Sequence, residues 1–298
     1  MIRSFSLTIS LAIGAPLWAN CDDLAKGLDD IHIVQNADHT IVGQDLDQIL
    51  DRGFMTFAVY EDFEPYSWMK DGKPTGIDID IAQMIADEIG VEAKFNFYTA
   101  DENVDADFRN QVWKGATIGG QVSNIMMHAP YSKDLGCRNE MVVLGGQYMN
   151  ETLSIAYRKD AFPEDPPTTP YFRYNKVGVE THTISDFYLS NFQGGMLLPN
   201  IVHYDSHEAA FEGMRANEVD AVMGVKGILE HNVSDGIMVH SPPLVNFSLN
   251  TWTLGIAVRM NYRELYYTAD GIIADAIADG RMAQIFENYG VSYLPPVY

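Results

Sequence analysis

The chain has 298 residues, with 19 lysines and arginines against 41 aspartates and glutamates, which gives a formal charge of −22. Nucleic-acid binding requires basic side chains that displace phosphate counterions, so this acidic balance excludes it. With 47% hydrophobic residues, the chain is too apolar for a disordered acidic protein. At about 150 residues per domain, the length predicts two domains.

The first 19 residues are typical of a secretory signal peptide. Arg3 precedes an uncharged, mostly apolar run from Ser4 to Trp18, and Ala19 is a small residue suited to cleavage. This run is too short to predict a membrane span, and no later stretch is apolar enough for one. We therefore predict export to the periplasm, cleavage near Ala19 and no membrane insertion after cleavage.

Residues 20–43 are polar and irregular, and we interpret them as an N-terminal arm. The chain has two cysteines, Cys21 and Cys137. In an oxidising compartment, a disulfide between them would tie the arm to the first domain. We predict this bridge because unpaired thiols are a liability in an exported protein; the alternative is two unpaired thiols.

Strands alternate with helices along the rest of the chain. The predicted helices are 44–53, 76–89, 108–114, a helix that opens at 181–186, 208–217, 227–232 and a helical tail at 262–289. The predicted strands are 54–60, 91–98, 122–127, 147–158, 176–180, 200–204, 219–225, 237–240 and 250–259. This alternation predicts an α/β architecture with mostly parallel sheets.

Several motifs follow one another in a specific order: Leu46–Val59, Phe63–Ser67, Asp71–Ala82, Lys176–Glu180, Val219–Gly224 and Gly280–Phe286. In this order they resemble family 3 extracellular solute-binding proteins, the receptors of ABC importers for polar amino acids. The resemblance extends over roughly residues 46–289. It implies an α/β type 2 periplasmic binding fold, with two lobes, two hinge strands and a ligand cleft between the lobes.

The same resemblance implies how the chain is divided. The first lobe is discontinuous and takes residues 44–150 and 256–298. The second lobe takes residues 151–255, and the hinge strands lie near 147–157 and 250–259.

Four aromatic residues follow the first predicted strand: Tyr60, Phe63, Tyr66 and Trp68. In open α/β sheets, ligands lie beyond the carboxyl ends of the strands. The four rings therefore predict a wall that stacks on a planar or apolar ligand. We expect Tyr60, together with Trp68 or Tyr66, to reach the cleft; the alternative is ordinary packing beneath a loop.

The chain departs from the family where the ligand's charged groups are bound. The family's arginine for the ligand carboxylate is missing after the fourth strand, where His128 stands with Lys133 as the nearest cation. The family's aspartate for the ligand ammonium is also missing, because Lys226 follows the corresponding strand. Without a bidentate arginine, carboxylate selectivity is weak, so we do not expect a standard α-amino acid as ligand.

Two other places are candidate anion anchors. Arg109 is one; the alternative is a surface salt bridge with Asp105 at helical spacing. The helix start at Thr181, His182 and Thr183 is the other, because free backbone N–H groups attract anions. The alternative there is simple N-capping by Thr183.

The leading hypothesis is a monomeric periplasmic solute-binding protein that captures a small molecule between its lobes for an ABC-type importer. We expect no catalytic residues, cofactor or metal, and a membrane permease as partner. The identity of the ligand stays open. Isothermal titration against a panel of metabolites tests this hypothesis.

Two other functions are weighed against it. Segments Asp105–Gly115 and Met126–Pro130 resemble a divergent subgroup found beside periplasmic quinoprotein alcohol or methanol dehydrogenases. An accessory protein of that kind would meet a dehydrogenase or a basic cytochrome through its acidic surface. A periplasmic dehydratase is the third hypothesis, and it requires His128 to pair with Glu64 or Asp62 as acid and base.

Overall fold

The computed structural model describes residues 43–116, 121–247 and 250–297. The predicted signal peptide, nearly all of the arm and Cys21 lie outside the described residues, so the cleavage site and the Cys21–Cys137 disulfide stay predictions. Among the described residues, no helix is long and apolar enough to cross a membrane.

The helices have the following bounds: α2 (Leu46–Arg52), α3 (Ile77–Ile89), α4 (Val104–Phe108), α5 (Lys133–Arg138), α6 (Ile184–Asn191), α7 (His207–Arg215), α8 (Lys226–His231), α9 (Arg263–Asp279) and α10 (Arg281–Asn288). A π-helix (Arg109–Trp113) and 3₁₀ turns at Thr169–Arg173 and Leu198–Asn200 accompany them.

The strands are β1 (Phe54–Tyr60), β2 (Trp68–Lys70), β3 (Lys73–Thr75), β4 (Glu92–Tyr98), β5 (Ile125–Tyr131), β6 (Val142–Arg158), β7 (Val177–Glu180), β8 (Ile201–Tyr204), β9 (Ala221–Val225), β10 (Ile237–His240) and β11 (Thr251–Arg259).

Local sequence explains the entry into the first sheet. The Asp45 side chain caps α2 by accepting from the Gln48 N–H, and the Gln48 side chain accepts in turn from the Asp45 N–H. Gly53, with a left-handed φ of 75°, ends the helix. The chain then enters β1, whose centre is buried.

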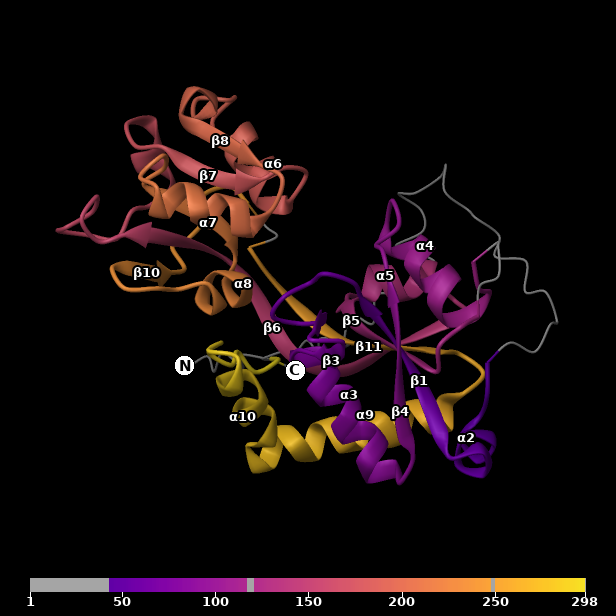
Figure 1. The fold of residues 1–298 in the computed structure, drawn as a ribbon. Helices are drawn as coiled ribbons and strands as arrows, with labels where there is room; N and C mark the ends of the chain where they lie inside the picture. The colour runs from indigo at the N-terminus through magenta and orange to yellow at the C-terminus, as the bar shows by residue number, and fades with distance from the viewer. Residues whose placement is uncertain (1–42, 117–120, 248–249, 298) are drawn as a thin grey trace, which may run out of the picture. The chain divides into compact units, whose positions relative to one another are not determined.

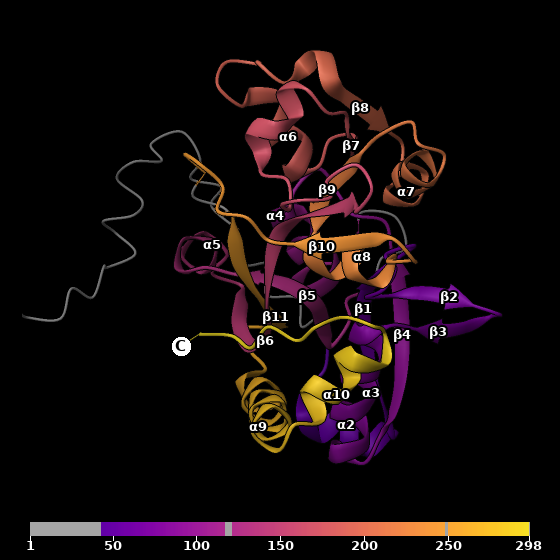
Figure 2. The ribbon, with the colours of Figure 1, turned by 90° about the vertical axis from the view of Figure 1, so that its left-hand side faces the viewer.

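The first sheet runs in the order β4-β1-β5-β11-β6. β1 is parallel to β4 and β5, and β11 is antiparallel to β5 and β6. Helices α3, α9 and α10 lie together beside this sheet (Figures 1 and 2), and their apolar residues share one core with it. We call this part of the chain the first lobe.

The second sheet begins on the same long strand. β6 pairs antiparallel with β9 and β10, and β7 lies parallel between β9 and β8. Two further clusters of buried apolar residues pack around these strands. We call this part the second lobe. β6 therefore belongs to both sheets (Figure 1), whereas the lobe boundaries near residues 150 and 255 stay a prediction.

β6 starts five residues before the predicted strand, at Val142 rather than at residue 147. Gly145 and Gly146 lie in this first part of β6. Because glycine weakens strand propensity, the sequence did not predict a strand there. Gly145 has a packing reason, because a Cβ there would lie 2.1 Å from the Tyr266 hydroxyl of α9. The sequence also missed α5, which Ser132 caps by accepting from the Leu135 N–H.

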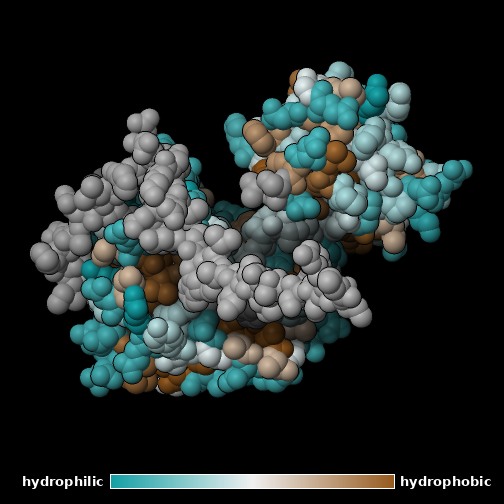
Figure 3. Space-filling model, turned by 180° about the vertical axis from the view of Figure 1, so that it is seen from behind, coloured by the Kyte–Doolittle hydropathy of each residue, from teal (hydrophilic) through white to brown (hydrophobic). Residues whose placement is uncertain are grey.

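Most charged side chains lie on the surface, and hydrophilic residues cover much of the face seen in Figure 3, with smaller hydrophobic areas among them. Among the described residues, the buried charged side chains are Asp78, Asp107, Glu151 and Arg259. A buried charge is costly unless it is hydrogen-bonded, so each of these four side chains requires a polar partner. Three of the four, the carboxylates, contact predicted ligand residues.

Candidate functional site

The site lies where two parallel strands of the first sheet end. After β1 the chain turns through α3 to β4 on one side, while β5 lies on the other side of β1. In open α/β sheets, such a switch in strand order opens a crevice at the carboxyl ends. The loop after β1 and the residue His128 of β5 both come to this crevice.

A cavity of about 860 Å³ opens between this loop and the second lobe. Its wall from the first lobe consists of Asp62, Phe63, Glu64, Trp68 and Met69. Its wall from the second lobe includes Glu180, Thr183, Ile184, Ser185, Ser206, His207, Glu208, Arg215, Val225, Ile228, His231, Asn232 and Val233. A volume of this size suits a small organic ligand.

The charges on this wall are mostly negative. Four carboxylates line it, two from each lobe: Asp62, Glu64, Glu180 and Glu208. Oε1 of Glu64 lies 3.0 Å from Nε2 of His231, and Glu180 pairs with His207. Of the described lining residues, Arg215 is the one lysine or arginine, and it donates to the backbone oxygen of Asn232. A cation is therefore favoured over an anion in this cavity.

The four predicted aromatic residues divide into two groups. Phe63 and Trp68 line the cavity. Trp68 also contacts the rings of Tyr289 and His231. Tyr60 and Tyr66 instead anchor the loop from within: Tyr60 donates to Asp107 at 3.0 Å, and Tyr66 is fully buried.

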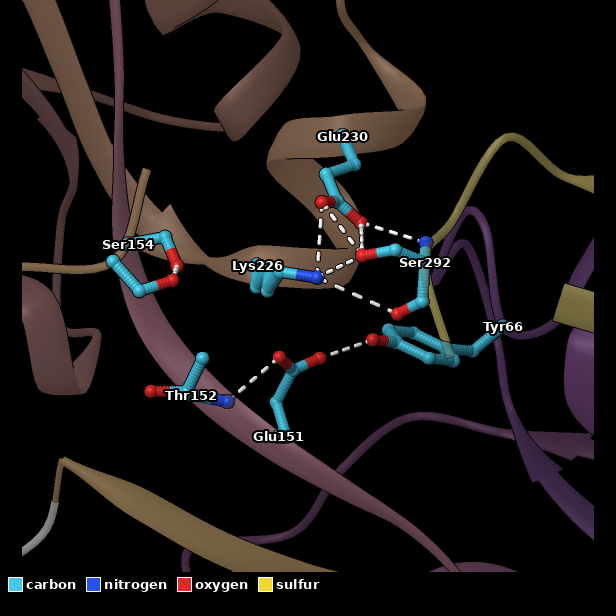
Figure 4. A network of polar contacts seen from close by, with 8 residues as sticks. Tyr66, Glu151, Thr152, Ser154, Lys226, Glu230 and Ser292 are labelled. Atoms are coloured by element: carbon cyan, nitrogen blue, oxygen red, sulfur yellow. Dashed lines mark hydrogen bonds and ion pairs between the residues drawn. The ribbon is translucent and has the colours of Figure 1, made fainter. Parts of the chain in front are cut away.

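Glu151 of β6 is the buried partner of Tyr66. The Tyr66 hydroxyl donates to one carboxylate oxygen, and the Thr152 N–H donates to the other at 2.8 Å (Figure 4). Burial raises the pKa of Glu151, although the hydrogen bonds from Tyr66, Thr152 and the Gly227 backbone oppose this rise. Glu151 thereby joins the β1 loop, the strand shared by both sheets and the start of α8.

Lys226, predicted from the resemblance to stand where the family places its ammonium-binding aspartate, contacts the C-terminal segment, residues 289–297. It pairs with Glu230 at 2.9 Å and donates to the Ser292 hydroxyl (Figure 4). Glu230 in turn accepts from the Ser292 N–H at 2.8 Å. The side chain of Lys226 is thus occupied in a contact between α8 and the C-terminal segment.

His128 is held by two residues that the sequence analysis did not single out. Its Nδ1 lies 3.0 Å from Oδ2 of Asp78, and its backbone N–H donates to the Tyr148 hydroxyl at 2.9 Å. The Tyr148 hydroxyl donates to Oδ1 of Asp78 at 2.7 Å. Asp78 is 1% exposed, so one buried carboxylate orients both groups.

At the helix start at residues 181–183, side chains of the same segment accept hydrogen bonds from the backbone N–H groups. Thr183 caps α6 by accepting from the Asp186 N–H, and the Thr181 hydroxyl donates to the backbone oxygen of Tyr204. The exposed His182 donates its N–H to Asp186 at 3.0 Å. Burial opposes a low pKa at Asp186, but hydrogen bonds from His182, Ser190 and His203 prevail and lower it. Thr183 is the member of this group that lines the cavity.

Two pairings weighed in the sequence analysis are wrong. Arg109 does not bridge to Asp105: its guanidinium donates to Asn110 Oδ1 at 2.9 and 3.1 Å, while Asp105 pairs with Arg138 at 3.1 Å. The helical spacing from Asp105 to Arg109 is present, since the Arg109 N–H donates to the Asp105 backbone oxygen, but the Asp105 carboxylate instead accepts from Arg138 and Asn139.

The acid–base pair of the dehydratase hypothesis does not form either. His128 pairs with Asp78, and Glu64 lies beside His231 instead. His128 and the loop carboxylates come from different elements, and only the fold decides which of them meet.

The key buried residues had weak sequence signals. Asp78 stands within the apolar stripe of α3, between Ile77 and Ile79, where a charge at a buried position could have been noticed. Glu151 is likewise the one charged residue in the apolar run of β6 before Arg158. Neither position reveals its partner, because Tyr148 and Tyr66 come from other parts of the chain.

Comparisons with known proteins show what the chain and its fold resemble. The family model of bacterial extracellular solute-binding proteins, family 3, matches residues 55–113. A search of curated proteins finds no match. Among solved structures, an ancestral cationic amino acid solute-binding protein is 23% identical with a TM-score of 0.66, over 82% of this chain and 99% of that one.

Other solved structures share the fold at similar distance. An amino acid ABC transporter substrate-binding protein from Streptococcus pneumoniae, bound to L-arginine, is 18% identical with a TM-score of 0.57, over 84% of this chain and all (100%) of that one. An ancestral amino acid-binding protein, described as a precursor of cyclohexadienyl dehydratase, is 21% identical with a TM-score of 0.57, over 82% and 98% of the two chains. These comparisons confirm that the chain resembles family 3 extracellular solute-binding proteins and has their two-lobed α/β type 2 periplasmic binding fold.

Proposed function

We propose that this chain is a periplasmic solute-binding protein of an ABC-type importer and that its ligand is a small organic cation rather than a standard α-amino acid. The charge of the cavity wall carries this proposal. Two carboxylates from each lobe line the cavity, against one arginine. A ligand cation between them would be attracted from both sides.

The same wall disfavours a ligand carboxylate. Arg109 directs its guanidinium to Asn110, and Arg215 donates to a backbone oxygen. A bidentate arginine is the usual partner of a carboxylate. Arg109 is not a lining residue of the cavity, and one nitrogen of Arg215, which is, already donates to Asn232. An α-carboxylate in the cavity would meet four carboxylates, two of which, Glu64 and Glu180, are paired with His231 and His207.

The names of two similar structures support the choice of a cation. One is a cationic amino acid solute-binding protein, and another holds L-arginine. For the present chain we propose the cationic part of such a ligand as the recognised group. The transport role follows the same relatives, one of which is an ABC transporter substrate-binding protein.

Capture in this design needs no chemical change of the ligand. A cation that contacts Asp62 or Glu64 on one side and Glu180 or Glu208 on the other stabilises the conformation in which both walls approach it. The permease would then bind to the surface of that liganded form. The expected role is that of a binder and not of an enzyme.

Isothermal titration of the mature chain tests the ligand class with three probes. L-arginine carries a guanidinium and an α-carboxylate, agmatine carries a guanidinium and an ammonium without a carboxylate, and L-glutamate has a net negative charge. We expect agmatine to bind at least as tightly as L-arginine, and L-glutamate to release no heat. Binding of L-glutamate alone would contradict the proposal.

Two substitutions on α7 provide a matched control for this titration. Glu208 lines the cavity, whereas Glu212 is exposed on the same helix and is not a lining residue. We expect Glu208→Gln to weaken agmatine binding by up to about fivefold, the range of an exposed ion pair, and Glu212→Gln to leave it unchanged. Equal effects of the two variants would point to general charge attraction rather than to the cavity.

A further inference from the structure

His128 lies in an irregular part of β5. β11 pairs Gly255 with Ala129 and Ala257 with Met126, so Met127 and His128 together face one residue of β11. This is a β-bulge, a feature that turns a side chain away from the regular alternation of the strand. His128 also has a positive φ of 58°, which is uncommon for any residue other than glycine. Such a backbone is often found at functional positions.

The hydrogen bonds around Asp78 determine which nitrogen of His128 carries hydrogen. An ionised carboxylate only accepts hydrogen bonds. The Tyr148 hydroxyl donates to Oδ1 of Asp78, so Oδ2 accepts from Nδ1 of His128 at 3.0 Å. In the neutral ring, the hydrogen is then on Nδ1 and the lone pair on Nε2.

His128 is not itself a lining residue of the cavity, but its ring packs against Phe63, which is. The His128 side chain is 11% exposed, and none of the hydrogen bonds among the described residues involves Nε2. Three rings surround the imidazole, with centroids 4.5 Å away for Tyr66, 5.0 Å for Phe63 and 6.4 Å for Tyr60. Phe63 also lines the cavity, so the imidazole lies next to the ligand space.

We infer that His128, in its Nδ1–H tautomer, is the recognition residue for an N–H group of the ligand. Nε2 accepts a hydrogen bond from a protonated amine or a guanidinium, and Phe63 of the cavity wall supplies an aromatic ring for a cation–π contact with the same charge. Asp78 and Tyr148 act as positioning residues, since they fix the tautomer without touching the ligand. The inference rests on the proposed function in taking the ligand to be an organic cation.

Nitrogen NMR on the full mature chain with labelled histidine tests the tautomer without any ligand. The His128 signal is assigned by its loss in His128→Asn, and the spectrum is taken at about pH 8, above the ordinary histidine range. The groups that face the ring are Asp78, Tyr148, Tyr60 and Tyr66, with Glu151 nearby. We expect a lone pair on Nε2 and hydrogen on Nδ1; hydrogen on Nε2 would overturn the inference.

Titration with agmatine tests the recognition step. His128→Asn keeps a donor to Asp78 at the position of Nδ1 and removes Nε2. We expect it to lose at least about tenfold in affinity, the worth of a hydrogen bond to a charged group. His203→Asn is the matched control, because His203 forms an exposed pair with Asp186 at 2.9 Å outside the cavity lining. Circular dichroism and thermal unfolding confirm that each variant is folded.

The outcomes separate this inference from the proposed function. If agmatine binds the parent chain and His128→Asn equally, recognition by His128 is overturned while the cationic ligand stands. If no cationic probe binds the parent chain, the proposed ligand class fails, and the tautomer measurement still decides the assignment of His128. If His128→Asn does not fold, the shift of the parent Nε2 signal on adding agmatine replaces the affinity comparison, and an unmoved signal overturns the inference.

Discussion

At the residue scale, Glu151 shows how one buried carboxylate joins several elements. It is 2% exposed and accepts hydrogen bonds from Tyr66 and from the Thr152 backbone. Its burial raises its pKa in the folded chain. The folded chain therefore holds a proton on Glu151 more tightly than the unfolded chain does, and this part of the stability is lost as the pH rises.

Glu151→Gln should remove this pH dependence, because the glutamine amide cannot ionise. We expect the free energy of unfolding of the parent chain to fall relative to that of Glu151→Gln as the pH rises from about 4 to 8, through the ordinary glutamate range and above it. Urea unfolding at several pH values measures the difference. Glu212→Gln, on the exposed side of α7, should follow the parent chain at every pH. Parallel curves for the parent chain and Glu151→Gln would contradict the prediction.

At the element scale, the start of α3 depends on a backbone contact that only glycine permits. Gly76 has a φ of 136°, and a Cβ there would lie 2.1 Å from the backbone oxygen of Tyr66. This contact places the β1 loop against α3, the helix that carries Asp78. The position of the His128 side chain therefore depends on the close approach at Gly76.

Gly76→Ala should lower the free energy of unfolding by about 3 kcal/mol, because both the backbone strain and the clash must be relieved. Gly72→Ala is the matched control. Gly72 has a left-handed φ of 75°, and a Cβ added there would meet nothing within 4 Å, so only the strain remains. We expect about 1 kcal/mol for that variant. Equal losses in chemical unfolding would show that the contact with Tyr66 is not limiting.

At the scale of the whole molecule, the C-terminal segment holds several elements in place. The Tyr289 hydroxyl donates to Asp80 of α3 at 2.9 Å, and the Ser292 N–H donates to Glu230 of α8 at 2.8 Å. Burial and the neighbouring Asp80 raise the pKa of Tyr289 to about 12. Tyr289 therefore stays neutral and keeps its hydrogen for Asp80 throughout the physiological range.

Removal of residues 289–298 should destabilise the whole fold. It deletes these hydrogen bonds and the one from the Tyr293 hydroxyl to the backbone oxygen of Tyr148, 2.8 Å long. At about 1 kcal/mol for each hydrogen bond, we expect a loss of about 3 kcal/mol or more in the free energy of unfolding. Removal of residues 297–298 alone is the control, since Val297 is 85% exposed. Equal melting temperatures for the two truncations would contradict the assigned role.

Much of the fold was predictable because its signals are local. Asp45 caps the start of α2 and Gly53 caps its end, through side-chain and backbone hydrogen bonds to residues only a few positions away. The order of motifs predicted the two-lobed fold, which the similar structures confirm. The partner of Arg109 was not predictable in the same way, because the Asp105 carboxylate is taken by Arg138 and Asn139, which are 33 and 34 residues away in the sequence.

The sequence by itself determined the α/β alternation and the acidic charge, since both can be read from residue types along the chain. Only the tertiary structure decided that His128 pairs with Asp78 rather than with Glu64, and that Tyr66 meets Glu151. These partners are 50 and 85 residues apart in the sequence. The physical reason is that such pairs form where strands and loops converge, and periodicity within one segment carries no information about what another segment places beside it.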